Sequence, residues 1–309
     1  MQGVKTARST GTLGTSTPRF LPFAAWASFI LNTLIIATGG AVRLTGSGLG
    51  CSEWPLCTPG SLVPTPELSY HSLIEFGNRT ISGPLLIAAI AVVLLTLKIR
   101  AQRRDLFVLS IVVLALVALQ AFVGGVIVWL HLNANLVGFH YVVSLILVSL
   151  TAAFLKRMYD APGPRERAVP KAYAILTHVT TLAMAVLILL GVLTTANGPH
   201  SGDANVVRDG FDATLLSHLH AWPGYITFAL VAVLVGWAAS KNLPILKWNV
   251  ALLALLVVQI VVGVIQARHG LPPLLVGIHM VLATLTAAAM TVTVLSLKKT
   301  ATETVETAE

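Results

Sequence analysis

The chain has 309 residues, of which 56% are hydrophobic and only 10% are charged. A soluble domain carries about 25% charged residues, so this composition excludes a water-exposed globular protein and predicts one embedded in a membrane. The formal net charge of +8 calls for no nucleic-acid partner, because membrane proteins collect Lys and Arg in their cytoplasmic loops.

Eight stretches of the sequence are long and apolar enough to span a bilayer as helices, which takes about 20 residues each. They cover residues 21–42, 73–97, 106–130, 135–156, 172–196, 214–238, 245–267 and 272–296. The predicted fold class is therefore all-α integral membrane, with eight transmembrane helices. Residues 1–20 are polar and rich in Ser, Thr and Gly, and we expect them to form a disordered cytoplasmic tail without a secretory signal.

The distribution of basic residues predicts the orientation. Of the 20 Lys and Arg residues, all but four fall in the tails or in the connections that share their side of the membrane. The positive-inside rule then places both termini in the cytoplasm of a multi-pass protein in the plasma membrane. The four exceptions lie at or near the opposite side: Arg43, Arg79, Arg208 and Arg268.

The only two cysteines, Cys51 and Cys57, lie in the first long loop, which this orientation places outside the cell. Six residues apart on a loop that faces an oxidising compartment, they can form a disulfide. A pair of unlinked thiols is the alternative.

The two halves of the chain repeat a pattern of Gln, Gly and His. In the first half, the segment Gln120-Ala-Phe-Val-Gly124 precedes His140. In the second half, Gln259-Ile-Val-Val-Gly263 precedes His279, so each of the three residue types recurs 139 positions later. Four helices per half return the chain to its starting side, which predicts parallel repeats that each form a four-helix bundle. The boundaries expected are bundles at 21–157 and 172–297, a cytoplasmic linker at 158–171 and a cytoplasmic tail at 298–309.

Most histidines gather near the outer ends of the predicted helices. His140 and His279 lie at matched depth, which suits axial coordination of haem iron between the helices of a bundle. Hydrogen bonding of each ring to backbone or water is the alternative. His218 and His220 are two residues apart and point to different faces of one helix. His220, which precedes the small Ala221, is favoured over His218 as the one that faces the bundle.

A stripe of polar residues is expected on the second helix. His71, Glu75 and Arg79 are spaced by four, so they share one helix face, with Asn78 beside them. A carboxylate there can accept or donate protons next to a bound substrate. In the alternative interpretation Glu75 only pairs with Arg79 to neutralise two buried charges, and the two are compatible.

Several of these motifs occur together in one family. Gly39-Gly-Ala-Val-Arg-Leu-Thr-Gly-Ser-Gly-Leu-Gly-Cys51, Trp54-Pro-Leu-Cys57 and Ile74-Glu-Phe-Gly-Asn-Arg79 resemble bacterial haem A synthase, as does Gly270-Leu-Pro-Pro-Leu-Leu-Val-Gly-Ile-His279. The resemblance covers about residues 21 to 297. It implies an oxidoreductase that converts haem O to haem A for cytochrome oxidase, by oxidising a ring methyl group to a formyl group.

The resemblance also implies roles for individual residues. The C-terminal half would hold a haem b through His220 and His279, and the N-terminal half would receive the substrate haem with His140 as one ligand. Glu75 matches the catalytic glutamate of the family. Cys51 and Cys57 match its cysteine pair in the outer loop.

This sequence departs from the family beside Arg79. Many members have a histidine where this chain has Asn78, and asparagine is a poor ligand for iron. Either His71, one turn away from Glu75, takes the place of that ligand, or the iron is five-coordinate through His140.

The partners implied are haem O as substrate, a haem O synthase in complex with this protein, and an electron donor that the sequence does not identify. Self-association into a homo-oligomer is left open. A non-enzymatic di-haem b electron-transfer protein is the main rival, and Glu75 distinguishes the two because a carrier needs no carboxylate beside a haem. A transporter built from parallel repeats would have broken helices near the midplane, whereas the polar residues here lie towards the outer face.

Overall fold

The computed structural model describes residues 17–65, 69–200, 202–203, 206 and 212–301. Within these residues, eight helices are long and apolar enough to cross a membrane, which confirms the predicted fold class. Every helix begins and ends within three residues of its predicted span. The helices are α1 (Leu21–Leu44), α2 (Tyr70–Leu97), α3 (Arg104–Trp129), α4 (Ala134–Tyr159), α5 (Lys171–Ala196), α6 (Ala213–Ser240), α7 (Leu246–Arg268) and α8 (Pro273–Leu295). Residues 1–16 and 302–309, most of the two expected tails, lie outside the described residues.

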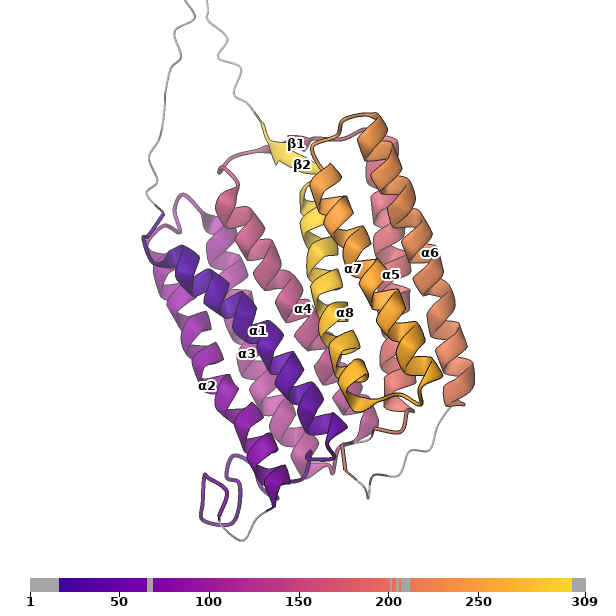
Figure 1. Cartoon of the computed structure of the whole chain (residues 1–309). Helices are drawn as coiled ribbons and strands as arrows, with labels where there is room; N and C mark the ends of the chain where they lie inside the picture. The colour runs from indigo at the N-terminus through magenta and orange to yellow at the C-terminus, as the bar shows by residue number, and fades with distance from the viewer. Residues whose placement is uncertain (1–16, 66–68, 201, 204–205, 207–211, 302–309) are drawn as a thin grey trace, which may run out of the picture.

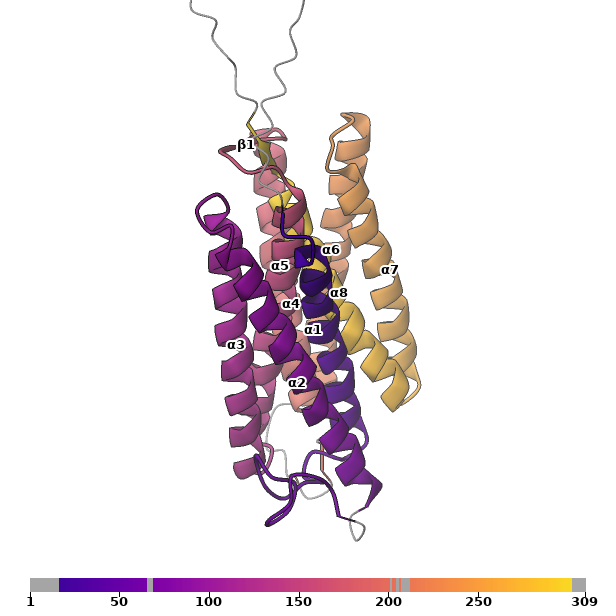
Figure 2. The same cartoon turned by 90° about the vertical axis from the view of Figure 1, so that its left-hand side faces the viewer.

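The helices form two groups of four that lie side by side (Figure 1). Helices α1–α4 pack on one another in the first group, and α5–α8 do so in the second. The groups meet where α4 packs on α8, with α1 also against α8 and α4 also against α5. Across this junction the hydroxyl of Tyr141 donates to the carbonyl of Met280 at 3.1 Å. Figure 2 shows the same two groups from the side of the first.

The outward faces of the helices are apolar. Leu182, Ile87 and Leu274 are between 67% and 75% exposed, which is the arrangement expected of side chains that contact lipid tails. Because lipid is as apolar as leucine, helices in a bilayer are held together by close packing and by polar contacts rather than by the hydrophobic effect. One such contact is buried in the second group, where Tyr173 donates to the carbonyl of Leu234 at 3.1 Å and the amide of Asn249 donates to the Tyr173 hydroxyl.

Two helices that carry predicted site residues begin at a capping side chain. Asn133 accepts from the backbone N–H groups two and three residues ahead, at 3.1 and 3.3 Å. Asp212 does the same at 2.7 and 3.2 Å. These bonds satisfy donors that the first turn of a helix leaves unpaired. The caps therefore fix the start of α4, two turns before His140, and of α6, two turns before His220.

A two-stranded ribbon closes one end of the bundle, which we call the strand end. Strand β1 (Arg165–Arg167) pairs antiparallel with β2 (Lys298–Thr300), with Arg165 opposite Thr300. The ribbon joins the chain after α8 to the connection between the two groups. The sequence predicts a linker and a tail over these residues and no strand.

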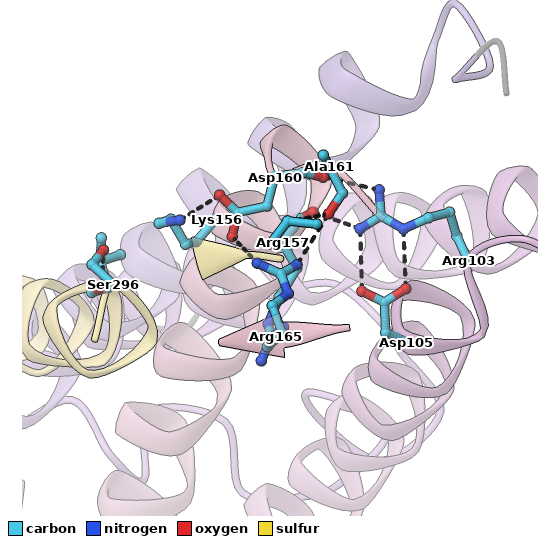
Figure 3. Close-up of polar contacts among 10 residues, drawn as sticks. Arg103, Asp105, Lys156, Arg157, Asp160, Ala161, Arg165 and Ser296 are labelled. Carbon is cyan, nitrogen blue, oxygen red and sulfur yellow. Dashed lines mark hydrogen bonds and ion pairs between the residues drawn. The ribbon is translucent and has the colours of Figure 1, made fainter. Parts of the chain in front are cut away.

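A network of ion pairs lies beside the ribbon (Figure 3). The carboxylate of Asp160, the residue after α4, pairs with Lys156 and, at 3.0 Å, with Arg165. Arg103 pairs with Asp105 at 3.1 Å and donates to the carbonyl of Asp160 at 3.4 Å. Burial opposes the charge of Asp160, but Lys156 and Arg165 outweigh it, so the pKa of this carboxyl lies below its ordinary value.

Candidate functional site

The opposite end of the bundle, which we call the disulfide end, is covered by the loop between α1 and α2. A disulfide joins Cys51 to Cys57, as predicted, and both residues are fully buried. The loop also contacts the connection between α5 and α6, because the N–H of Gly48 donates to the carbonyl of Gly202 at 2.7 Å. The disulfide loop therefore touches both halves of the chain.

The predicted polar stripe of α2 holds this loop. Glu75 is buried, and its Oε2 accepts the backbone N–H of Cys51 at 2.7 Å. Its Oε1 pairs with Nη2 of Arg79 at 2.5 Å. Nη1 of Arg79 donates to the carbonyls of Glu53 and Leu56 at 2.8 and 2.9 Å. The ion pair considered in the sequence analysis is present, and it forms part of a larger network that fixes the loop.

His71 belongs to the same stripe and also faces the loop. Its Nδ1 lies 2.9 Å from the hydroxyl oxygen of Ser47, and its ring packs on Tyr70 with the ring centres 4.0 Å apart. His71 is the second residue of α2 and Asn78 the ninth, so at about 1.5 Å of rise per residue it lies roughly 10 Å nearer the disulfide end. The structure therefore separates His71 from the level of Asn78.

Trp54 docks the loop on α3. Its ring meets that of Trp129 edge to face, with the centres 5.6 Å apart. It also fills the space beside Gly125, where an added Cβ would lie 2.5 Å from the indole. A side chain at position 125 would push the loop away, so this glycine permits the close approach. Neither Trp54 nor Gly125 carries a sequence pattern that predicts this contact.

The second half brings two predicted ligands close together, with their rings edge to face. The ring centres of His220 on α6 and His279 on α8 are 6.3 Å apart. Nδ1 of His220 donates to the carbonyl of Leu187 at 3.0 Å, which leaves Nε2 as the nitrogen with a free lone pair. His218 is exposed on another face of α6, so the residue favoured from the sequence is the one that points into the group.

Each of these histidines lies over a glycine of the preceding helix. A Cβ added to Gly191 on α5 would lie 2.7 Å from Cε1 of His220, and one added to Gly263 on α7 would lie 3.1 Å from Cε1 of His279. Gln259, one turn before Gly263, donates to the backbone carbonyl of His279 at 3.1 Å. We call such a glycine, which lies under a polar side chain of the following helix, a glycine seat.

The first half repeats this arrangement at His140. An added Cβ at Gly124 on α3 would lie 3.7 Å from Cε1 of His140. Gln120 donates to the backbone carbonyl of His140 and to the hydroxyl of Ser144, each at 2.7 Å. The Gln and Gly that the sequence repeats before each histidine are therefore the residues that hold that histidine.

Asn78 is part of the same pattern on α2. An added Cβ at Gly39 on α1 would lie 3.7 Å from Oδ1 of Asn78. The hydroxyl of Thr38 donates to the same oxygen at 2.7 Å. The side chain of Asn78 therefore points towards α1, whereas those of Glu75 and Arg79 point towards the loop.

The chemistry of the donors fits a haem better than a bare metal ion. Among the described residues no group of three or more His, Cys, Asp and Glu side chains could hold a metal ion, and a bare ion such as zinc normally takes three or four protein ligands. The ring centres of His220 and His279 are 6.3 Å apart. This is close to the distance expected between two imidazole rings that bind one metal from opposite sides through bonds of about 2 Å. Nδ1 of His140 and of His279 is buried and has no hydrogen-bond partner among the described residues. A porphyrin supplies the remaining ligands itself, so two histidines are sufficient.

Most of the chain matches one known protein family. Residues 23–291 match the COX15-CtaA family, described as cytochrome oxidase assembly protein. The chain belongs to this family. The matched segment runs from α1 to α8 and contains every residue of the candidate site.

Individual heme A synthases are similar to this chain over shorter or longer stretches. It is 32% identical to the heme A synthase of Exiguobacterium sibiricum over 141 residues, which are 44% of this chain and 46% of that protein. It is 32% identical to the heme A synthase of Staphylococcus saprophyticus over 179 residues, 54% of this chain and 57% of that one. These two alignments thus span about half of each relative. Identity to a heme A synthase of Bacillus cereus is 27% over 266 residues, 79% of this chain and 83% of that protein.

Proposed function

We propose that this protein is a haem A synthase of the plasma membrane, which oxidises a methyl group of haem O to a formyl group and so makes haem A. Its place in the COX15-CtaA family and the names of its relatives support this function. The observation that carries the proposal is the pair formed by His220 and His279, which face each other at a spacing that suits one haem iron.

The C-terminal half would bind a haem b through His220 and His279. Haem iron supplies redox chemistry, in which the axial ligands set the potential. The carbonyl of Leu187 fixes the tautomer and orientation of His220, since a histidine ligand commonly donates its other ring N–H to such an acceptor. Gly191 and Gly263 leave room for the two rings in this position.

The N-terminal half would bind the substrate haem through His140, whose ring lies over Gly124 and whose backbone is held by Gln120. Haem O is hydrophobic and carries a long isoprenoid tail, so it can enter this half from the lipid. The C-terminal half would then transfer electrons through its haem b, and the N-terminal half would hold the substrate haem while it is oxidised.

Glu75 is the proposed proton donor and acceptor beside the substrate. It lies three residues before Asn78, so the two are neighbours about one turn apart on α2. The N–H of Cys51 and the guanidinium of Arg79 fix the orientation of its carboxylate. The disulfide and the docking of Trp54 on α3 in turn fix Cys51, so the loop acts to position this one side chain.

The same proposal includes the orientation of the chain. The strand end carries Arg103, Lys156, Arg165 and Lys299, which the positive-inside rule places in the cytoplasm together with the termini. The disulfide end would then face the oxidising side of the membrane. A haem O synthase in the same membrane is the proposed source of substrate.

Product analysis tests the function directly. The full chain is expressed together with a source of haem O, and the extracted haems are separated by chromatography. Wild-type protein should yield haem A or its hydroxylated precursor. Glu75→Gln should lose haem A while it keeps the spectrum of the haem b held by His220 and His279.

Glu53→Gln is the matched control, because it removes a carboxylate of the same loop. Arg79 binds the backbone carbonyl of Glu53 and not its side chain, so this contact is kept. This variant should still form haem A. Unchanged haem O in wild-type protein that is folded and loaded with haem b would reject the enzyme and leave the di-haem electron carrier as the better interpretation.

A further inference from the structure

Four helices of the bundle present a polar side chain at nearly the same depth. His140 and His279 are each the seventh residue of their helices, α4 and α8. His220 is the eighth residue of α6, and Asn78 is the ninth residue of α2. Because each helix begins at the disulfide end, these four side chains lie within about one helical turn of the same level.

Each of the four side chains also occupies a glycine seat. The seats are Gly39 for Asn78, Gly124 for His140, Gly191 for His220 and Gly263 for His279. In the second half the occupants of the two seats, His220 and His279, face each other across the group of helices. In the first half the corresponding seats hold His140 and Asn78.

We infer that Asn78 occupies the position of the second axial ligand in the N-terminal half, so that this half holds the iron of its haem through His140 alone. This inference rests on the proposed binding of a substrate haem at His140. An amide is a poor iron ligand beside imidazole, and Oδ1 of Asn78 is already bonded to the hydroxyl of Thr38. That bond turns the amide oxygen towards α1. One face of the iron is left without a protein ligand.

The same contacts exclude His71 as a substitute. Its ring lies roughly 10 Å nearer the disulfide end, by the rise of α2, and it is bonded to Ser47 in the loop. Glu75 and Arg79, the other polar residues nearby, are bonded to each other and to the same loop. Asn78 is therefore the residue of α2 whose side chain occupies a seat.

The consequence is a functional difference between two otherwise similar halves. An iron with two histidine ligands is suited to electron transfer, because it changes charge without exchanging ligands. An iron with one histidine and an open face can bind a small molecule. Asn78 would thus leave the iron of the N-terminal half open to a small molecule.

Ligand binding to the purified full-length protein tests this inference. The C-terminal site is saturated with haem b and the chain is then titrated with haem O. The spin state of each iron is measured by optical and paramagnetic resonance spectroscopy, and carbon monoxide is added to the reduced protein. Wild-type protein should contain one low-spin haem, together with one high-spin haem that binds carbon monoxide.

Asn78→His should convert the second haem to the low-spin form and abolish carbon monoxide binding, because it places an imidazole over Gly39. Thr80→His is the matched control: it adds a histidine to the exposed face of α2 two residues away and should leave the high-spin haem unchanged. The low-spin spectrum of the C-terminal haem reports folding in every variant.

A wild-type chain whose second haem is low-spin and indifferent to carbon monoxide would overturn the inference, as would one that takes up a single haem. So would a high-spin second haem in the Asn78→His variant. These readouts do not depend on haem A formation. If the protein binds carbon monoxide as expected but leaves haem O unchanged, the proposed enzyme activity is rejected. The role assigned to Asn78 is kept in that case.

Discussion

Glu75 and Cys51 share a hydrogen bond of 2.7 Å, from the backbone N–H of the cysteine to the carboxylate of the glutamate. The side chain proposed for proton transfer is therefore bonded to the residue that begins the disulfide. Arg79 completes the arrangement, since it contacts Glu75 and two loop carbonyls at once. Helix α2 and the loop fix each other through these three residues.

Arg79→Lys should loosen the disulfide loop without unfolding the protein. Lysine carries a single ammonium group and cannot reproduce the three contacts of the guanidinium fork. We expect faster cleavage of the loop by a protease in limited digestion, and lower haem A formation than in wild-type protein. Arg100→Lys, in the connection at the strand end, should show neither effect. Wild-type digestion rates in Arg79→Lys would show that the other contacts hold the loop.

Replacing a glycine seat by alanine should weaken haem binding most where the least space is available. Gly191→Ala places a methyl group 2.7 Å from His220, Gly263→Ala places one 3.1 Å from His279, and Gly124→Ala leaves an ordinary 3.7 Å contact. Overpacking costs about 1–3 kcal/mol, so the low-spin spectrum should fall most in Gly191→Ala and less in Gly263→Ala. Gly236→Ala on α6, where nothing lies within 4 Å, is the control. An equal loss in all of them would contradict the proposed seats.

Tyr173→Phe should destabilise the second group of helices. It removes a donor to the carbonyl of Leu234 and an acceptor for the amide of Asn249, and all of these groups are buried. A buried polar group left unpaired costs about 1–3 kcal/mol, which a thermal melt in detergent can detect. Tyr159→Phe, at an exposed hydroxyl bonded to Trp26, should shift the midpoint much less.

The ion pairs of Asp160 should make the strand end sensitive to acid. The pKa of this carboxyl is lower in the folded protein than its ordinary value of about 3.9. Its stabilisation is therefore complete above about pH 4 and is lost as the pH falls through the folded value. Asp160→Asn should lower the melting temperature at pH 7 and remove part of the decline in acid. An acid profile identical to wild type would show that other carboxyls control it.

The helices were predictable because the bilayer sets their length. Only a helix satisfies every backbone polar group in lipid, so runs of apolar residues gave all eight spans to within three residues. The choice of His220 over His218 also followed from local geometry, since two residues along a helix lead to a different face. Both inferences depend on neighbours in the sequence.

The contacts between helices were not predictable in the same way. The repeat of Gln and Gly before His140 and His279 was visible, but its purpose depends on which helices are neighbours. The stripe of α2 was expected beside a substrate, but the sequence did not reveal that Glu75 and Arg79 also bind the loop. The ribbon of β1 and β2 was not predicted, because each strand consists of three charged or polar residues, a pattern typical of solvent-exposed loops and tails.

The ribbon also fixes an order of events during synthesis. Strand β1 leaves the ribosome after four helices, but its partner β2 follows the eighth. Until then, β1 has an unpaired edge, and the first four helices can insert and pack on their own, as N-terminal units commonly do. Pairing of the two strands then requires that α8 has already crossed the membrane beside α4. The smallest element of secondary structure therefore completes only after both halves have been inserted.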